Sequence, residues 1–499
     1  MLGPTHFRFL GEEGELEDIG WDGDVRSKLW RYNQHYFDDL NAKGAGDRAD
    51  WHRHLLQRWV LDNPPADGSG WEPYPTSLRI VNWVKWALAG HSLPDECRES
   101  LAVQARWLSR RLEIHLLGNH LFANAKALVF AGAFFTGPEA ERWLRTGFRI
   151  LEREVSEQIL PDGGHFERST MYHALALEDM LDLMNLLRSL EPAGDLQDER
   201  LRTELGRFLS DWPARIQAMI GWLNAVRHPD GGISFFNDAA EGIAPGCESL
   251  MAYARRLGFE TDTVFGELTH LIQSGYIRMA NREACLFFDA APVGPDYLPG
   301  HAHADTLSLE LSLFGQRLFV NSGTSEYGLG QERLRQRSTA AHNTVEVNGT
   351  DSSEVWSGFR VARRAYPGKV KVDDSGGCLE SRACHDGYHR LASPVSVCRA
   401  IALNENRLEI EDTLEGRFEV AVCRFYCHPS VRVEKVGQSA LALQLPGSQR
   451  ARVSFEGAAS IEVENSTWHP RFGVAEPNQC IAVSFNGSRV LTKLEWSQC

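Results

Sequence analysis

The first half of the chain carries apolar residues at the three- and four-residue spacing of amphipathic helices. Segment 77–90, SLRIVNWVKWALAG, follows this spacing and ends on glycine, which is typical of a helix C-terminus. Segment 121–135, LFANAKALVFAGAFF, is small or apolar on most faces and predicts a tightly packed inner helix. Segment 169–190 opens with a Ser/Thr cap candidate and continues as a long apolar stripe. Segment 204–228 predicts one or two further helices, with Pro213 marking a break.

A short motif recurs at matching places in this helical half. The stretch LPDGGHFE (160–167) follows a helical run, and so does HPDGGISFFND (228–238). Asp-Gly-Gly after proline is a turn signal. Two such turns suggest stacked helix pairs, as in a toroid or a solenoid, with chance recurrence of a common turn as the alternative.

From about residue 275 the pattern changes to alternating apolar and polar residues, interrupted by glycine, asparagine and proline. This predicts an antiparallel β domain that runs to the C-terminus. Such an abrupt change indicates two layers of different class rather than a mixed sheet, and a groove where they meet is a natural ligand site. The clearest strand segments are 285–293, 307–323, 342–351, 407–416 and 431–445.

Composition agrees with this division. The 499 residues are too many for one ordinary core, and 43% hydrophobic and 10% aromatic residues are typical of a globular chain. Fourteen tryptophans are a supply of sugar-stacking side chains, but in a helical protein they more often lie in the core.

The net charge of −15 argues against general nucleic-acid binding. It leaves room for a polyanionic substrate, because a basic groove can lie on an acidic protein. Each of two basic clusters, taken alone, is more typical of solvated surface. The clusters are Arg333, Arg335 and Arg337, and Arg360, Arg363 and Arg364.

Ten cysteines lie without a CxxC pair or a regular spacing, so reduced thiols are expected. The closest pairs are Cys378 with Cys384 and Cys423 with Cys427. The N-terminal residues lack the basic and apolar regions of a secretory signal, and no apolar run approaches the roughly 18 residues of a membrane span. A cytoplasmic protein without a membrane span is expected, or a periplasmic or secreted one if a leader is missing.

Two polar motifs lie at predicted helix starts. Asn119 and His120 precede the small-residue helix, where an amide and an imidazole could withdraw charge from a carboxylate; Asn119 could equally be a helix N-cap. Tyr172 and His173 fall in the first turn of another helix, an exposed place by its sequence. A tyrosine there can act as acid or base if cations shift its pKa, and ordinary packing is the alternative.

A third group of polar residues opens the β domain. In GHAHADTLSLEL, the side chains of His301, His303 and Asp305 would share one face of an extended chain. His303, Asn321 and His342 lie on neighbouring predicted strands, and two imidazoles with an oxygen donor are a common metal-binding set. Scattered histidines are a weak signal in isolation.

Taken together, these stretches resemble the heparinase II/III family of polysaccharide lyases. The motifs HAHADTLSLEL, FVNSGT, EYG and RSTAAHNTVEVNG carry the resemblance in the second half, and LWRYNQHYFDDL, GNH and DGGHFERSTMYH in the first. The resemblance implies an incomplete (α/α) toroid like that of alginate lyases over residues 1–272, followed by an antiparallel heparinase II/III-like β-sandwich over 273–499. It covers nearly the whole chain and implies a bacterial enzyme of glycosaminoglycan metabolism.

The activity that the resemblance implies is β-elimination in a uronate-containing glycan. The proton at C5 is weakly acidic, so the neighbouring carboxylate must be neutralised, a base must reach C5, and an acid must reach the glycosidic oxygen. By motif, Asn119 and His120 would neutralise the carboxylate, and Tyr172 would be base, acid or both. His301 would be the second catalytic group, and Tyr327 stands where some members have another functional tyrosine. Substrate contacts are expected from Glu167, Arg168, His173 and Arg337.

The resemblance also implies a structural zinc held by His303, Asn321 and His342. The usual third ligand is an aspartate, and Asn321 is a weaker donor. Asp305 or water could complete the site, and calcium or no metal is the alternative. The expected partner is an acidic polysaccharide, without nucleic acid; a homodimer is also compatible.

Two other functions compete with the lyase. A glycoside hydrolase needs two facing acids, for which Glu167, Glu178 and Asp238 are the candidates, and its products would lack a double bond. A non-catalytic glycan-binding or exopolysaccharide-biosynthesis-associated protein on the same fold is supported by Asn321 and by the missing leader.

Overall fold

The computed structural model describes residues 1–193 and 198–497. Contacts within the chain divide it into two compact units. The first consists of Met1–Gln158 and Asp179–Ala214, and the second of Ile159–Glu178 and Arg215–Cys499. The predicted domain boundary at residue 272 stays a prediction. The helix α10 (Cys247–Arg256) and the strand β3 (Leu268–Leu271) do bracket the change in secondary structure that the periodicity indicated.

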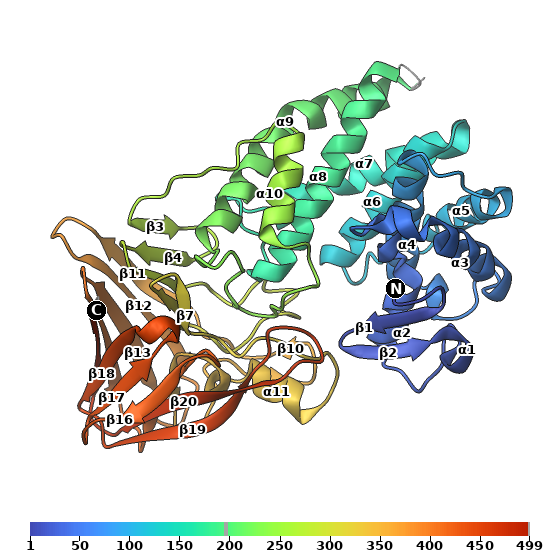
Figure 1. Ribbon diagram of the computed structural model, residues 1–499. Coiled ribbons are helices and arrows are strands. Elements are labelled where there is room, and N and C mark those ends of the chain that lie inside the picture. Colours follow the sequence, from blue (N-terminus) through green and yellow to red (C-terminus); the bar gives the residue numbers. More distant parts are fainter. Residues whose placement is uncertain (194–197, 498–499) are drawn as a thin grey trace. The chain divides into compact units, whose positions relative to one another are not determined.

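The first unit is built from helices that follow one another along the chain (Figure 1). The predicted helix at 77–90 is α4, and the predicted inner helix is α6, which is buried on nearly every face after its first turn. Eight tryptophans of this unit are buried, three of them on α3 and α4, as expected for a helical protein (Trp21, Trp30, Trp59, Trp71, Trp83, Trp86, Trp143 and Trp212). The helices that lie wholly within it are α1 (Leu16–Ile19), α2 (Lys28–Tyr36), α3 (Ala49–Asp62), α4 (Pro73–Leu88), α5 (Asp95–Leu108), α6 (Gly118–Phe134) and α7 (Pro138–Gln158). It also contains a two-stranded sheet of β1 (His6–Phe9) and β2 (Glu12–Glu15).

A buried charge network ties α6 to its neighbours in this unit. Lys126 Nζ of α6 donates to Asp179 at 2.6 Å and to Asp182 at 2.7 Å, and Lys85 of α4 donates to Asp182 at 3.0 Å. Burial alone would raise the pKa of Asp182, but the two lysines lower it to about 2. A buried lysine needs such partners, so the network fixes α6 and the functional candidates at its start.

Two long helices run through both units. They are α8 (Thr170–Ala193) and α9 (Glu199–Ala225). The predicted break at Pro213 is wrong, because Pro213 lies inside α9. A proline removes one backbone donor from a helix, and the surrounding packing outweighs that loss here.

The repeated Asp-Gly-Gly motif is a repeat in structure as well as in sequence. In the first copy Leu160 N–H donates to Gly164 O at 2.8 Å; in the second, His228 N–H donates to Gly232 O at 2.9 Å. The first glycine of each pair, Gly163 or Gly231, has a positive φ of 90° or 92°, which a side chain would disfavour. The two turns therefore have the same geometry, and each ends a long helix.

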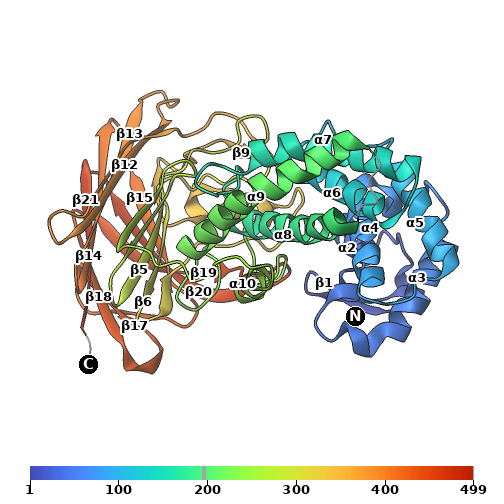
Figure 2. The ribbon, with the colours of Figure 1, turned by 90° about the horizontal axis from the view of Figure 1, so that it is seen from above.

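Antiparallel sheets make up most of the second unit. Figure 2 shows the eight-stranded sheet as one layer and the smaller sheets as a second layer against it. One apolar core draws on strands from all three sheets. The eight-stranded sheet has the order β11 (Pro367–Asp373), β12 (Leu379–Tyr388), β13 (Val395–Leu403), β14 (Arg407–Gly416), β21 (Arg489–Ser497), β18 (Arg450–Glu456), β17 (Ala440–Gln444) and β16 (Arg432–Lys435).

The two smaller sheets carry the loops of the candidate site. One has the order β3, β4 (Tyr276–Ala280), β5 (Ala284–Asp289), β6 (Leu309–Leu313) and β7 (Gln316–Phe319). The other has the order β19 (Ser460–Trp468), β20 (Glu476–Phe485), β15 (Ala421–Tyr426) and β8 (Val345–Val347). The predicted antiparallel β region is confirmed. Within the described residues, no helix has the length and apolar character needed to cross a membrane.

The expectation of reduced cysteines is wrong at one place. Cys384 of β12 and Cys398 of β13 form a disulfide, and they are directly opposite each other in the strand pairing. Cys378 and Cys423, members of the pairs closest in sequence, are free thiols. Sequence proximity could not identify the bonded pair, because the register of two strands brings it together.

One buried arginine joins the eight-stranded sheet to the loops of the candidate site. Arg399 of β13 donates to both oxygens of Asp412 on β14, at 2.8 and 3.0 Å. It also donates to the backbone carbonyls of Leu307 and Asn343, which precede β6 and β8. Neither Arg399 nor Asp412 has exposed side-chain surface, so removal of one would leave the other buried and unpaired.

We therefore expect Asp412→Ala to lower the free energy of unfolding by about 3–5 kcal/mol, the usual cost of leaving a buried charge unpaired. The measurement is chemical unfolding of the full chain followed by circular dichroism. Glu409→Ala is the control, because its partner Arg407 lies 3.6 Å away at the surface, and it should change stability by at most about 0.5 kcal/mol. Equal losses in both variants would contradict the anchoring role of Arg399.

Candidate functional site

In the first unit, Asn119 and His120 lie in the first turn of α6. The N-cap position is Leu117, with a positive φ of 57°, so Asn119 is not the cap that its sequence context allowed. The Asn119 amide is half-buried and makes no hydrogen bond within the part of the chain that the structure describes. It is therefore free to donate to a ligand.

The buried carboxylate of Glu113 orients His120. Its Nδ1 lies 3.1 Å from Glu113 Oε1, and the other carboxylate oxygen accepts a hydrogen bond from Asn124 at 3.0 Å. The Tyr74 ring packs on the imidazole, with centroids 4.6 Å apart. With Nδ1 directed to Glu113, His120 keeps Nε2 for another partner, and 34% of its side chain is exposed.

In the second unit, the two Asp-Gly-Gly turns place the remaining candidates. The first turn leads into α8, which carries Tyr172, and the second leads to Asp238. Hydrogen bonds join the segments behind the turns, from Ser169 Oγ to Asp238 O and from Thr170 Oγ1 to Ser234 O. The repeat thus brings two residues far apart in sequence to one place.

Asp238 is the centre of this group. Its side chain is fully buried, and it accepts from His301 Nδ1 at 2.8 Å, from His303 Nε2 at 2.8 Å and from both terminal nitrogens of Arg333. Burial alone would raise the pKa of Asp238, but Arg333 and the two imidazoles hold it well below its usual value. A permanent carboxylate there fixes the tautomers of both histidines, so His301 presents its Nε2 lone pair outward.

His301 lies against two tyrosines. Its ring centroid is 4.0 Å from that of Tyr172 and 5.8 Å from that of Tyr327, and the two phenol oxygens are 3.0 Å apart. Tyr172 is buried, so its expected exposure is wrong. Burial first, then the neighbouring Tyr327 and Asp238, raises the pKa of Tyr172 well above its usual value. Both phenols therefore carry their protons at neutral pH, and the structure brings three predicted catalytic residues together.

The helix α11 (Gln331–Arg337) supports this group with buried cations. Arg333 donates to Gly358 O as well as to Asp238, and its guanidinium lies 4.9 Å from the Tyr327 ring centroid. Arg337 donates to the carbonyls of Ala302, Ser357 and Arg360. Both side chains are buried, so the interpretation of this cluster as solvated surface is wrong for these two residues.

These arginines fix a short hairpin beside the three catalytic candidates. The hairpin consists of β9 (Val355–Trp356) and β10 (Arg360–Val361). Phe359, in its turn, lies 5.2 Å from the Tyr327 ring and 5.9 Å from the His301 ring and is 41% exposed. An exposed aromatic ring next to the His301 group offers a surface for the apolar face of a sugar.

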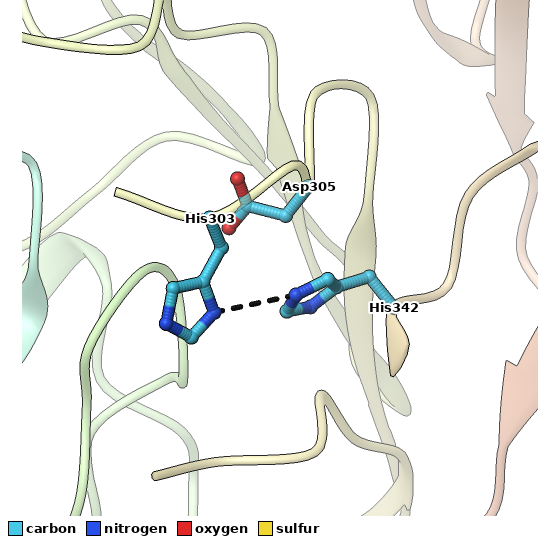
Figure 3. Close-up of side chains that lie close together, drawn as sticks. All are labelled: His303, Asp305 and His342. Carbon is cyan, nitrogen blue, oxygen red and sulfur yellow. Dashed lines mark hydrogen bonds between the residues drawn. The ribbon is translucent and has the colours of Figure 1, made fainter. Parts of the chain in front are cut away.

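His303, which is hydrogen-bonded to Asp238, forms a pair with His342. His303 Nδ1 is 3.3 Å from His342 Nε2, and Asp305 lies beside them (Figure 3). The ligand atoms of these three buried residues lie within 4.8 Å of one another. Asp238 accepts a hydrogen bond from His303 Nε2–H, and Asn321 Oδ1 lies 3.3 Å from His342 Nδ1.

With the Nδ1 proton of His342 directed to Asn321 Oδ1, both facing nitrogens present lone pairs; in the other His342 tautomer, Nε2 donates a hydrogen bond to His303 Nδ1. Burial, and for His342 then also His303, lowers the pKa of each imidazole, which favours the neutral form. Two lone pairs at 3.3 Å repel unless a cation lies near both. Two imidazoles and a carboxylate fit a transition-metal ion such as zinc. In this arrangement Asn321 lies behind His342, as an acceptor that orients the ring, while Asp305 stands beside the facing nitrogens.

The residues expected to contact substrate are held by the protein itself. His173 is buried against Trp222, its Nε2 contacts Met219 O at 3.0 Å, and burial lowers its pKa to about 4. Arg168 donates to the carbonyls of Ser274 and Phe166. Glu167 is buried. Their role in substrate binding, like that of Arg337, stays a prediction, and their observed contacts position the loops.

Sequence reasoning missed the charged residues that orient the candidate histidines. Asp238 was considered only as a hydrolase acid, and neither Glu113 nor Arg333 was singled out for the site. The second Asp-Gly-Gly copy was the available signal for Asp238, since the first copy leads to Tyr172. No comparable signal marks Glu113.

Two family models match the chain. One, described as heparinase II/III-like, C-terminal, matches residues 266–497; the other, described as heparinase II/III N-terminus, matches residues 56–252. The chain belongs to the heparinase II/III family. The family resemblance carried by the motifs is thereby confirmed.

Family relatives differ in what their names describe. A heparin-sulfate lyase of Bacteroides stercoris is 28% identical over 277 residues, 49% of this chain and 38% of the relative. The matched region thus spans well under half of that relative's length. FtsZ-localized protein C of Caulobacter vibrioides is 26% identical over 466 residues, 86% of this chain and 76% of the relative.

The fold is shared with solved structures. A crystal structure of heparinase III matches with a TM-score of 0.75 at 18% identity, over 98% of this chain and 80% of that chain. A heparan sulfate lyase HepC mutant from Pedobacter heparinus matches with a TM-score of 0.68 at 17% identity, over 99% and 81%. The expected helical toroid followed by an antiparallel β-sandwich is confirmed.

The histidine pair predicts how metal binding responds to substitution. In the parent protein, we expect one zinc ion per chain after exposure to zinc and dialysis, measured by elemental mass spectrometry. His342→Ala and Asp305→Asn should abolish stoichiometric zinc, because each removes a ligand. Asn321→Ala should weaken zinc affinity by about tenfold, the usual effect of removing an outer partner.

The reverse order would contradict this assignment. If Asn321→Ala loses the zinc while Asp305→Asn retains it, Asn321 is the third ligand. Asn478→Ala, which removes a buried amide elsewhere in the second unit, is the control and should leave the zinc content unchanged.

Proposed function

We propose that the protein is a polysaccharide lyase that cleaves an acidic, uronate-containing glycan by β-elimination. The observation that carries the proposal is the group of His301, Tyr172 and Tyr327 above the buried carboxylate of Asp238. Heparin-sulfate lyases among the family relatives support this class of substrate.

β-Elimination places negative charge on the uronate carboxylate as the C5 proton leaves. The Asn119 amide has no protein partner in the described structure, and His120 directs its Nε2 away from Glu113. An amide donor and an imidazole are suited to hold that carboxylate. Glu113 lies against Nδ1 and fixes the orientation of the His120 ring.

The hydrogen bonds within the second unit support an assignment of acid and base. His301 donates its Nδ1 proton to Asp238, so its Nε2 is the base that accepts the C5 proton. Tyr172 keeps its phenolic proton and delivers it to the glycosidic oxygen as the bond to C4 breaks. Tyr327, hydrogen-bonded to Tyr172, replaces that proton from solvent.

Zinc held by His303, His342 and Asp305 would brace this arrangement. The ion would supply positive charge where two lone pairs and a carboxylate meet, and it would fix the loop that also carries His301. Asp238 would then orient both His301 and His303 from one position.

Asp238, a candidate acid for a glycoside hydrolase, is unsuited to that role. Asp238 is surrounded by Arg333 and two imidazoles, which hold its pKa well below its usual value, so it can neither donate a proton nor reach a sugar. Glu167 is buried as well. A hydrolase needs a protonated acid and an accessible carboxylate facing each other.

A non-catalytic glycan-binding protein is the second candidate. It is favoured by the relative named FtsZ-localized protein C, which aligns with more of this chain than the Bacteroides stercoris lyase does. In that case Asn119, His120 and the His301 group would bind an anionic sugar without breaking it, since fold does not fix activity.

Tyr172→Phe separates the two candidates. If the protein is a lyase, ultraviolet absorbance of unsaturated uronate products should rise with heparan sulfate or another uronate polymer. Tyr172→Phe should lower kcat by about 10²–10⁴-fold, as expected for loss of a general acid, with the fold intact by circular dichroism. Tyr366→Phe, an exposed tyrosine of the second unit, is the control and should retain full activity.

The absence of product from every uronate polymer, with and without zinc, would refute the lyase. Binding of the polymer that is equal in the parent and in Tyr172→Phe, without turnover in either, would favour the glycan-binding candidate.

A further inference from the structure

The first unit contains a hollow of about 470 Å³ lined by aromatic and basic side chains. Trp71 and Trp107 form its apolar wall, and Arg110, Arg111 and His115 contribute polar groups from the loop that follows α5. Its volume lies in the range of ordinary small-ligand sites. None of these residues belongs to the catalytic candidates.

The tryptophan wall is rigid. Trp107 Nε1 donates to Trp71 O at 2.8 Å, and Trp71 Nε1 donates to Asn63 O at 3.2 Å. The two indole rings meet edge to face, with centroids 6.2 Å apart. Because both indole N–H groups are satisfied within the protein, the rings keep their orientation and offer apolar surface rather than hydrogen bonds.

Neither arginine makes a direct contact with an acid in the described residues; Arg110 interacts with Glu139 only through a longer-range charge interaction. Both are exposed, and within the described residues neither guanidinium forms an ion pair or donates a hydrogen bond. The Arg111 guanidinium lies 4.0 Å from the Trp107 ring centroid, a cation–π contact that holds it at the hollow. The acid that lines the hollow, Glu72, is already paired with Lys28 Nζ at 2.9 Å and with the Tyr32 hydroxyl. Unpaired guanidinium groups on a chain of net charge −15 leave room for an anion.

The hollow and the His120 site share two segments of the chain. Glu72 lines the hollow, and Tyr74, two residues on, packs against His120. Arg111 lines the hollow, and Glu113, two residues on, holds His120 Nδ1. When the uronate of a glycan lies at His120, the neighbouring monosaccharides of that glycan are therefore within reach of the hollow.

We propose that this hollow is a binding subsite for an anionic sugar unit of the substrate, outside the bond that is cleaved. The sugar ring would pack on Trp107, and its sulfate or carboxylate would accept hydrogen bonds from Arg110 and Arg111, whose planar groups match such anions. This inference rests on the proposed function for the identity of the polymer, and it deepens that function by locating where a longer chain gains affinity.

Binding to the full chain tests the subsite separately from turnover. In a Tyr172→Phe background, affinity for a size-defined heparan sulfate octasaccharide is measured by titration calorimetry. Arg110→Ala and Arg111→Ala should each weaken binding on the order of three- to tenfold, as expected for exposed charged contacts. Arg111→Lys should lose less, because the charge remains. Arg98→Ala is the matched control, an exposed arginine of α5 that does not line the hollow, and it should bind as the parent does.

A second octasaccharide, which carries carboxylates but no sulfates, distinguishes the two anions. A sulfate subsite predicts that the arginine substitutions weaken the sulfated octasaccharide and leave the unsulfated one unchanged; a carboxylate subsite predicts that both weaken. In the active protein, the same substitutions should raise KM for polymer more than KM for the shortest cleaved oligosaccharide.

The outcomes separate the two proposals. Arginine variants that bind both octasaccharides as Arg98→Ala does would overturn the subsite, even if the lyase activity is real. A parent that binds neither octasaccharide would also overturn it. Weakened binding in the arginine variants of a protein that cleaves no polymer would leave the subsite standing and refute the lyase.

Discussion

The candidate site depends on one buried carboxylate. Asp238 has no exposed side-chain surface, yet it is charged because Arg333 and two imidazoles surround it. Arg333 is itself fixed between Asp238 and the hairpin at Gly358. Since an unpaired charge at this depth would be strongly unfavourable, these groups stabilise one another only as a set. The orientation of His301, the tautomer of His303 and the position of the hairpin all follow from this ionic centre.

Each unit holds one histidine in the same manner. In the first unit Glu113 contacts His120 Nδ1, and in the second Asp238 contacts His301 Nδ1. A carboxylate at Nδ1 fixes the ring and leaves Nε2 for chemistry. The two acids differ in their surroundings, because Asp238 is neutralised by Arg333, whereas Glu113 is supported by the neutral Asn124. Glu113 therefore shares its carboxylate between an imidazole and an amide, without a guanidinium.

Much of the fold could be predicted from the sequence. The periodicities identified α4, α6, α8 and the β region, because each buries a regular face. Pro213 misled the prediction, since local propensity is weak against the packing around a long helix. The disulfide between Cys384 and Cys398 depends on strand register, which residue spacing does not reveal. Motifs singled out Tyr172, His301 and His342 as candidates, whose roles stay predictions, but did not reveal the burial of Tyr172 or of Arg337. Burial is decided by segments distant in sequence, so single motifs carry little information on it.

The twin Asp-Gly-Gly turns have a consequence for how this protein can vary. Tyr172 stands on a helix whose start is fixed by the first turn, and each added residue would rotate the tyrosine by about 100° around the helix axis. Asp238 follows the second turn in an irregular segment that bends at Asn237, which has a positive φ of 58°, so an added residue would displace its carboxylate. Both turns are hydrogen-bonded at their bases, so neither can absorb such a change. An insertion between a turn and its functional residue would therefore move Tyr172 or Asp238 away from His301, whereas added length in the loops beyond them would leave both in place.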